Sequence, residues 1–545
     1  MNNNNSLKTK SSVPGFYRFA DTFGKWFFMC FCAFLLLTAL LSTSYINDIM
    51  TQKVLFKWDN PIPNILVGAV FILGFSLLGK AFKSKSRLRN NLFLYVTLAW
   101  IFVSGVALAI FGRSVPAADA KSVFVMADMA SKGDLSFITG SDSYLSFYPH
   151  QIGLVSFYTL PLYIWNKIGI NISSLHIFKI VNCLLCCGAV LFQYHTIKNI
   201  LKDKSYADYI SVIYLILAGL NVPLIFYTSF VYGEIPAVFA ISGSMYFLSR
   251  IISDLDSFTA KAFNKKILKT VLPKSLAFVF FSALSVFIRK NSMIFIIALS
   301  IVLVVEVIKS KRLFYILLLT VTVTCAINVL PLTVKIYENA SGNKLLSGVT
   351  ATSYFAMGMQ ESDRGCGYYN GFNINTYTES GFNTDLANEA SRLAILERLD
   401  YFKSNPSYAF NFYLKKYLAQ WSDGTYSVRQ ATWAESGGRR DIIQSIYTGD
   451  LGNAFVIYCN LYQFVIYLGC FLFFLKSVIK RKSGKSAYSF YILLGIIFTF
   501  GCFLFHMLWE ANSRYIFPCS VFLMPYAAAG FASNFPMTIK SHKDK

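Results

Sequence analysis

Charged residues are scarce in this sequence. Only 14% of its 545 residues are Asp, Glu, Lys or Arg, whereas a typical soluble domain carries about 25%. Hydrophobic residues make up 55% of the chain, and the mean hydropathy is +0.50. Apolar runs recur at about the ~20-residue length that crosses a bilayer. The composition excludes an ordinary soluble protein and predicts an all-α polytopic membrane protein.

Several signatures of other protein classes are also missing. The five histidines are scattered, so the sequence predicts no zinc site. Ten of the 11 cysteines lie in apolar runs and Cys366 alone lies in a polar loop, which implies no disulfide framework. No Gly-rich nucleotide-binding loop and no internal repeat is found, and we expect no cofactor. The first apolar run, 27–41, lacks a cleavage site and is interpreted as a span rather than a signal peptide.

The net charge of +23 could indicate a nucleic-acid partner, but the placement of the basic residues argues against one. Of the 50 Lys and Arg residues, 29 fall in seven short segments that alternate between the apolar runs. Such enrichment marks cytoplasmic loops, where basic residues also attract anionic lipids. We therefore expect membrane lipids, and not nucleic acid, to contact these charges.

Twelve spans fit this charge pattern, with both termini in the cytoplasm. They cover approximately 26–45, 62–79, 91–112, 176–197, 207–226, 235–252, 274–289, 292–308, 313–333, 454–475, 487–507 and 515–532. The chain then divides into a cytoplasmic tail (1–25), three spans (26–112), a first external loop (113–175), central spans (176–333), an external cap (334–453), C-terminal spans (454–535) and a second cytoplasmic tail (536–545).

One more apolar segment, 150–165, could pass for a thirteenth span. A crossing there would place the basic loop at 198–204 outside, against the charge pattern. Its short length and Pro161 instead favour a juxtamembrane or re-entrant helix on the outer side. In the near-neutral cap, apolar residues at helical spacing over 384–405 and a Pro-initiated stretch over 406–421 predict two helices.

Ionisable residues at the outer ends of the spans are the candidate functional residues, because a charge at membrane depth costs at least a few kcal/mol and often has a function. They are Asp119, Glu234, Arg289, Lys290, His506, Glu510 and Arg514. The last three follow each other at intervals of four, so they would share one face of a continuous helix. Structural interpretations also exist: Glu234 could cap a helix, the cations could snorkel, and Glu510 could pair with Arg514.

Outer acids and outer cations on a membrane-embedded body suggest chemistry on a lipid-linked anion. A sugar joined to polyprenyl phosphate fits, because its phosphate is both the anion to be held and the leaving group. Transfer to a hydroxyl needs a general base for the acceptor proton and cations for the departing phosphate. A carboxylate can do the first, and Arg or Lys the second.

The order of four short motifs resembles the GT-C glycosyltransferases, which include protein O-mannosyltransferases and the aminoarabinose transferase of lipid A. In that superfamily an acid follows the first core span, as Asp119 does here, and a Tyr-Pro motif opens a juxtamembrane helix, as at Tyr148-Pro149-His150-Gln151. A later span ends in an Arg-Pro-Asn-like element, matched by Arg289-Lys290-Asn291. The C-terminal acid, Arg-Tyr pair and Pro are matched by Glu510, Arg514-Tyr515 and Pro518.

The match has departures. Two extra spans precede the core, and Lys290 replaces the Pro. Asp119 is preceded by Ala118 where some members have paired acids, which leaves open whether Glu234 shares the work of Asp119. The first loop also has no Asp-x-Asp pair, so a resemblance to metal-dependent oligosaccharyltransferases is poor and we expect no metal.

The resemblance implies a GT-C-like bundle of about 12 transmembrane helices and an inverting single displacement. Asp119 or Glu234 would be the base. Arg289, Lys290 and Arg514 would hold the donor phosphate. The residues that would shape the site are Tyr148, His150, Gln151, His506, Glu510 and Tyr515. The acceptor would be a glycan, lipid or protein at the outer face of the membrane. Independently of the resemblance, the short loops and the absence of a disulfide framework indicate a bacterial plasma membrane.

Two alternative functions were weighed. A cell-surface oligosaccharide polymerase or ligase also combines a dozen spans with a large external loop, but typically relies on outer-loop Arg and His rather than on a first-loop acid. A flippase or transporter would not need the large cap. The chain also lacks the internal repeats and paired broken helices of many transporters.

Overall fold

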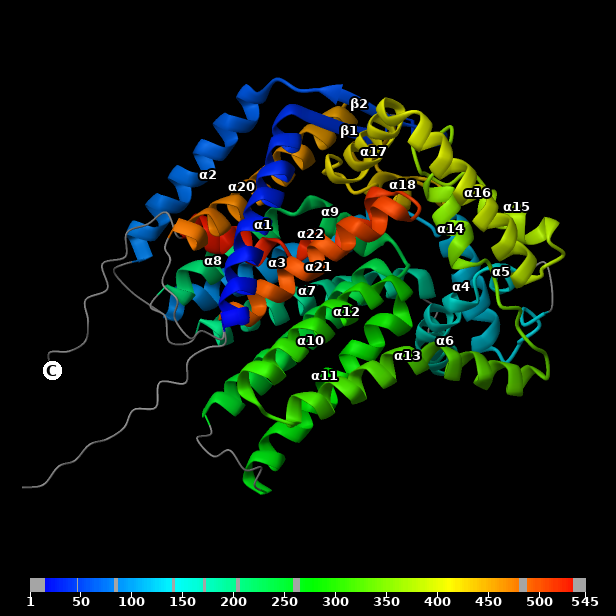
Figure 1. The fold of residues 1–545 in the computed structure, drawn as a ribbon, viewed down its shortest axis with the longest axis horizontal. Helices are drawn as coiled ribbons and strands as arrows, with labels where there is room; N and C mark the ends of the chain where they lie inside the picture. The colour runs from blue at the N-terminus through cyan, green and yellow to red at the C-terminus, as the bar shows by residue number, and fades with distance from the viewer. Residues whose placement is uncertain are drawn as a thin grey trace, which may run out of the picture.

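The computed structural model describes residues 15–46, 48–82, 87–139, 143–169, 173–201, 206–257, 265–479 and 488–532. Within these ranges the regular elements are helices apart from one two-stranded hairpin (Figure 1), and ten helices are long and apolar enough to cross a membrane. Two bent helix pairs raise the number to as many as 12. The predicted fold class, an all-α polytopic protein of about 12 spans, is confirmed. Residues 1–14 and the predicted tail 536–545 lie outside the described residues.

Each candidate span overlaps one span predicted from the sequence. The straight ones are α1 (Gly15–Leu41), α2 (Pro61–Phe82), α3 (Arg87–Phe111), α7 (Ser174–Ile200), α10 (Glu234–Ser257), α11 (Lys265–Ile288), α12 (Met293–Ser310), α13 (Phe314–Ser341), α20 (Leu451–Ile479) and α21 (Tyr488–Leu508). The bent ones are α8 (Ala207–Leu220) with α9 (Val222–Phe226) and the 3₁₀ turn η2 (Tyr227–Ser229), at 60°, and α22 (Ser513–Val521) with α23 (Met524–Ala532), at 48°.

Helix α10 is the most enclosed of the ten straight candidate spans, with 72% of its apolar window buried. It packs between α7 and α11. Glycines allow this close approach, because a Cβ at Gly188 of α7 would meet Phe239 at 2.7 Å and one at Gly243 would meet Phe281 at 2.6 Å. The N-terminus of α10, where Glu234 lies, is therefore held firmly inside the bundle.

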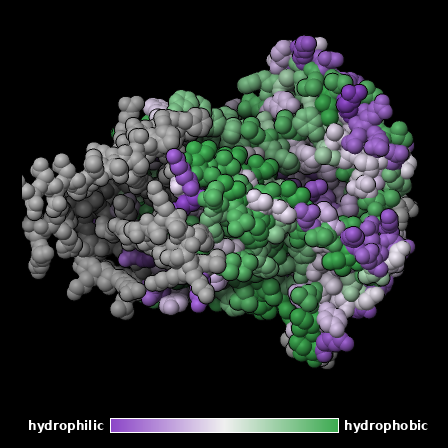
Figure 2. Space-filling model, turned by 60° about the horizontal axis from the view of Figure 1, so that its bottom comes forward, coloured by the Kyte–Doolittle hydropathy of each residue, from purple (hydrophilic) through white to green (hydrophobic). Residues whose placement is uncertain are grey.

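The remaining helices gather at one end of the bundle (Figure 1). They are α4 (Ala118–Ser131), α5 (Tyr144–Phe147), the 3₁₀ turn η1 (Pro149–Gln151), α6 (Ile152–Ile168), the 3₁₀ turn η3 (Lys290–Ser292), and the cap helices α14 (Ala351–Gly358), α15 (Phe372–Glu379), α16 (Thr384–Ser404), α17 (Pro406–Trp421), α18 (Val428–Thr432) and α19 (Asp441–Thr448). Helix α6 contains most of the apolar segment 150–165, which could have passed for a thirteenth span. It packs against α4 and is not among the ten candidate spans. The surface view shows hydrophilic residues concentrated at this same end, beside a broad hydrophobic zone (Figure 2).

Two features were not anticipated from the sequence. A hairpin of β1 (Ser42–Ile46) and β2 (Val54–Trp58) follows α1, with Ser42 opposite Trp58. It docks on the cap, where the Ser44 amide donates to the Ser422 carbonyl at 3.0 Å. The predicted first span therefore ends four residues early, at Leu41. A disulfide also joins Cys502 of α21 to Cys519 of α22, because the turn between these helices brings two apolar segments side by side.

Candidate functional site

The centre of the candidate site is one buried carboxylate shared by two guanidinium groups. Glu234 is 0% exposed, and Nη1 of Arg289 lies 2.5 Å from its Oε1. Nε of Arg514 lies 3.6 Å from the same oxygen, while Oε2 has no hydrogen-bond partner among the described residues. A buried acid needs such compensation. Since two cations face one anion, this group of three keeps a net positive charge.

Aromatic rings hold the two guanidinium groups in place. The Arg514 guanidinium carbon lies 5.7 Å from the ring centres of Phe230 and Tyr232 and 5.4 Å from that of Tyr515. The guanidinium carbon of Arg289 lies 5.7 Å from the centre of the same Tyr515 ring. Cation–π contacts of this kind orient Arg while leaving N–H groups at its edge available.

Asp119 lies in the first turn of α4 and faces this cationic group. Its side chain keeps an exposed surface, yet protein atoms surround it so closely that desolvation raises its pKa. The charge of Arg514 and a hydrogen bond from Tyr144 act in the opposite direction, and the charge of Glu234 adds to the rise. Asp119 is thus both reachable from outside and poorly hydrated. The preceding residue, Ala118, has a strained φ of +47°.

The Tyr-Pro motif lies along the same site. Burial, together with the charges of Asp119 and Glu510, raises the pKa of Tyr148. Gln151 donates a 2.7 Å hydrogen bond to the Tyr232 hydroxyl, and thereby reaches the loop that precedes α10. These contacts place the first-loop motif against the acids and cations that the sequence analysis had singled out.

His150 and Lys290 lie together at the edge of the site. Burial, with a smaller contribution from the nearby charge of Lys290, lowers the pKa of His150 to about 3. Lys290 is exposed at the start of η3. His150 is therefore neutral near pH 7, and Lys290 adds a cation beside the Arg289 backbone.

The segment from His506 to Arg514 is not one continuous helix. Helix α21 ends at Leu508 and α22 begins at Ser513, with the Asn512 side chain capping α22 by accepting from the Arg514 amide at 2.9 Å. The shared helical face proposed for His506, Glu510 and Arg514 is therefore wrong. Among the described residues Arg514 forms its ion pair with Glu234 and not with Glu510, although the charge of Arg514 still lowers the pKa of Glu510.

Tyr515 connects the remaining members of this segment. Its hydroxyl donates to Oε1 of Glu510 at 3.1 Å, and its ring stacks on His506 with centroids 5.5 Å apart. Burial raises the pKa of Glu510 to about 7, although the Tyr515 hydrogen bond and the Arg514 charge lower it. Nδ1 of His506 has no hydrogen-bond partner among the described residues.

Lys416 of α17 is a member of the site that sequence reasoning missed. It is fully buried and donates to the carbonyls of Gly358, at 2.5 Å, and Trp509, at 2.7 Å. Burial lowers its pKa to about 7, against the raising influence of Glu510. A signal was present, since position 416 shares a helical face with the buried residues Phe412 and Gln420.

Tyrosines were missed as well. Tyr144, Tyr232, Tyr354 and Tyr369 all lie close enough to Asp119 for its charge to raise their pKa values, although burial is the largest cause in each case. With 33 tyrosines spread along the chain, no pattern distinguished these four. They surround the acids with hydroxyl groups.

No group of three or more His, Cys, Asp or Glu side chains that could hold a metal ion occurs within the described ranges. No known protein family matches the sequence, no curated protein matches it, and no solved structure matches the fold. Function is therefore inferred from the residues of this chain.

Proposed function

We propose that this chain is an inverting glycosyltransferase that moves a sugar from a polyprenyl-phosphate donor to a hydroxyl acceptor at the outer face of a bacterial plasma membrane. The observation that carries the proposal is the convergence of a reachable carboxylate, Asp119, on a cationic group built from Arg289 and Arg514. The resemblance of the motifs to GT-C enzymes supports the same assignment.

The cationic group would hold the donor phosphate. Arg has five N–H donors, and Glu234 engages only part of those on Arg289 and Arg514. The remaining donors suit the oxygens of a phosphate, which planar guanidinium groups bind in pairs. Lys290, exposed beside them, would add a third positive charge. Glu234 would thus position the arginines.

Asp119 would act as the general base. Its exposed surface lets an acceptor approach, whereas Glu234 is enclosed by its two arginines. In the reaction the acceptor oxygen attacks the anomeric carbon, and its proton passes to the Asp119 carboxylate. The bond from that carbon to the phosphate oxygen breaks, and the electron pair leaves with the polyprenyl phosphate. The arginines stabilise this departing charge.

The surrounding polar groups would orient the sugar. Tyr148, Gln151 and Tyr515 present hydrogen-bonding groups near the acids, and Glu510, with a pKa of about 7, exchanges readily between donor and acceptor. His506 supports Tyr515 by stacking. Pocket shape in this region would select the sugar.

Reconstitution in liposomes tests the proposal. A synthetic polyprenyl-phosphate sugar is supplied with hydroxyl acceptors, and mass spectrometry follows both glycosidic bond formation and movement of the donor across the bilayer. We expect a new glycosidic bond to one acceptor class, with single sugars added. Movement without a new bond would instead show a flippase, and addition of whole oligosaccharide repeats would show a polymerase or ligase.

A further inference from the structure

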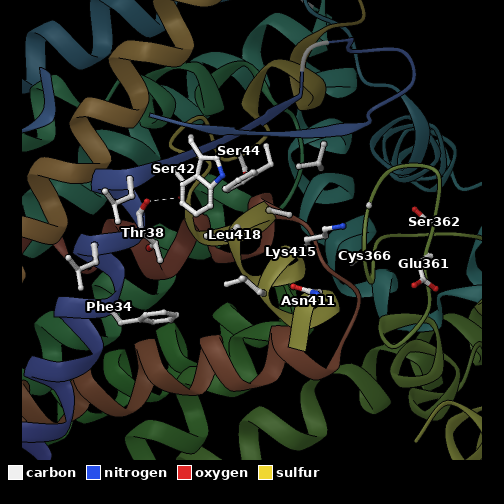
Figure 3. Close-up of a pocket in the computed structure, with 18 residues that line it drawn as sticks. Phe34, Thr38, Ser42, Ser44, Glu361, Ser362, Cys366, Asn411, Lys415 and Leu418 are labelled. Atoms are coloured by element: carbon white, nitrogen blue, oxygen red, sulfur yellow. Dashed lines mark hydrogen bonds between the residues drawn. The ribbon is translucent and has the colours of Figure 1, made fainter. Parts of the chain in front are cut away.

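A groove of about 600 Å³ lies between α1, the β1–β2 hairpin and α17 (Figure 3). We call it the hairpin groove. Most of its wall is apolar, with Phe34 and Leu37 of α1 facing Leu418 of α17. The hairpin closes it with Phe56 and Trp58. A space of this size and lining suits a hydrocarbon chain.

The other end of the hairpin groove is polar. Glu361 and Ser362 of the cap lie at one extreme of the close-up, with Asn411 and Lys415 between them and the apolar wall (Figure 3). Glu361 is already bound by Arg398 at 2.7 Å. The lining carries one carboxylate and one ammonium group, and Arg398, which does not line the groove, pairs with the carboxylate. Lys415 is the only cation among the described residues that line the groove and lies beside an amide and a hydroxyl, so this end suits a hydroxyl-bearing head group better than a phosphate, which paired guanidinium groups such as those of Arg289 and Arg514 bind.

The apolar wall is continuous with the lipid-facing surface of the bundle. Phe34, Leu37 and Leu41 are exposed residues of a candidate span. Trp58, 71% exposed at the rim, is a residue type that concentrates where a bilayer meets water. A molecule could therefore enter the hairpin groove sideways from the membrane.

The polar end also lies near the acids of the candidate site. Cys366 lines the groove. Tyr369 follows it three residues later, and its pKa is raised by burial and, in addition, by the charges of Glu510 and Asp119. Three residues span at most about 11 Å. Arg364, in the same loop, lowers the pKa of Glu510 through its charge.

The cations assigned to the donor phosphate lie elsewhere. Arg289 and Lys290 belong to the α11–η3 connection, and no residue of that connection lines the hairpin groove. The cations and the hairpin groove thus lie in different parts of the structure.

We propose that the hairpin groove binds the acceptor, and that this acceptor is an amphiphile whose hydrocarbon chain lies against α1 and β2 while its neutral, hydroxylated head reaches past Cys366 toward Asp119. The assignment as acceptor rests on the proposed function. Binding in the groove does not.

Photolabelling of the full chain in nanodiscs tests this proposal. Two diazirine probes are compared, dodecyl maltoside as a neutral amphiphile and farnesyl phosphate as an anionic one, and crosslinks are mapped by mass spectrometry. Dodecyl maltoside should label 34–58 and 361–419, and farnesyl phosphate should label the α11–η3–α12 region. Leu37→Trp, which fills the groove, should lower groove labelling by dodecyl maltoside about tenfold, or about 1.4 kcal/mol.

Leu73→Trp on the exposed face of α2 is the matched control and should leave labelling unchanged. Even labelling of all lipid-facing helices, insensitive to Leu37→Trp, would show bulk lipid only and overturn the proposal. Preferential farnesyl phosphate labelling of the groove would make it the donor site instead. If the groove is labelled as expected but no amphiphile receives sugar while a peptide or glycan does, the acceptor assignment fails. If nothing receives sugar, the proposed function fails with it, and the binding site alone stands.

Discussion

At the residue scale, Lys416 connects the cap to the segment that carries Glu510. Its ammonium group joins the Gly358 carbonyl to the Trp509 carbonyl, and Gly367 must lack a side chain because a Cβ there would lie 2.6 Å from the lysine Cε. The Gly367 carbonyl in turn accepts from the Ala511 amide at 2.7 Å. Lys416 is therefore a positioning residue for Glu510 and its neighbours.

Replacing Lys416 with Met should loosen this connection. Two buried carbonyls would lose their partner, at a cost of about 1–3 kcal/mol each. We expect a lower unfolding temperature and faster hydrogen–deuterium exchange over 506–512. Lys415→Met, at the exposed neighbouring position, is the control and should change neither. Equal behaviour of the two variants would contradict the positioning role.

Glu510 should make stability depend on pH. Burial raises its pKa from 4.5 to about 7, so between these values the folded chain holds a proton that the unfolded chain has released. The free energy of unfolding therefore falls as pH rises through this window, by on the order of 3 kcal/mol for this group. Glu510→Gln should flatten the fall in unfolding temperature between pH 5 and 7.5. The exposed Glu379→Gln should not, and an unchanged slope in Glu510→Gln would refute the raised pKa.

Four charged residues of the site stand out in the sequence, whereas their partners and the buried Lys416 do not. Asp119, Glu234, Arg289 and Arg514 stand out because ionisable residues are costly beside apolar spans. The pairing of Arg514 with Glu234 depends on how α22 folds back on α10, which spacing along the chain does not encode. Local spacing instead suggested a pair with Glu510, four residues away.

At the scale of elements, the break between α21 and α22 aims Arg514 into the bundle. The last residue of α14, Gly358, lies directly on this break, and a Cβ there would come within 2.4 Å of the Leu508 carbonyl oxygen. The backbone of α14 at Gly358 therefore packs directly against the backbone of the α21–α22 connection at Leu508 and Trp509. No rearrangement of a flexible side chain could relieve an added methyl group.

Gly358→Ala should therefore displace the break and destabilise the chain by about 1–3 kcal/mol. Gly74→Ala on α2, where a Cβ would have no neighbour within 4 Å, is the control and should be neutral or stabilising by up to about 1 kcal/mol. Thermal unfolding and exchange over 508–512 measure both effects. A Gly358→Ala variant as stable as Gly74→Ala would show that the contact is not tight.

The spans were predictable because apolar length is a strong signal, and all twelve candidates overlap predicted ones. The bends and the hairpin were not. The break in the α8–α9 pair arises at Asn221, whose side chain accepts from the Leu224 amide, a local contact inside an apolar run. The two strands, Ser42–Ile46 and Val54–Trp58, lie between two spans and bond to the cap, where the Ser44 amide donates to the Ser422 carbonyl.

At the scale of the whole molecule, orientation in the membrane follows from charge. The hydrophilic end in Figure 2 carries the cap, and the basic loops predict that this end faces outward. In that orientation the site would face outward too, within reach of a lipid-linked donor on the outer leaflet.

Cysteine accessibility in intact cells checks this orientation. In a Cys366→Ser background, Asp385→Cys in the cap should react with a membrane-impermeant maleimide, and Lys311→Cys in the α12–α13 connection should react only after permeabilisation. The reverse pattern would place the site in the cytoplasm and remove the proposed donor.

The most direct test of the central claim is sugar transfer by Asp119→Asn. The variant keeps the size of the side chain but cannot take the acceptor proton, so we expect turnover of the polyprenyl-phosphate sugar to fall about 10²- to 10⁴-fold, with donor binding and unfolding temperature close to wild type. Turnover retained near the wild-type rate in a well-folded Asp119→Asn chain would contradict the account.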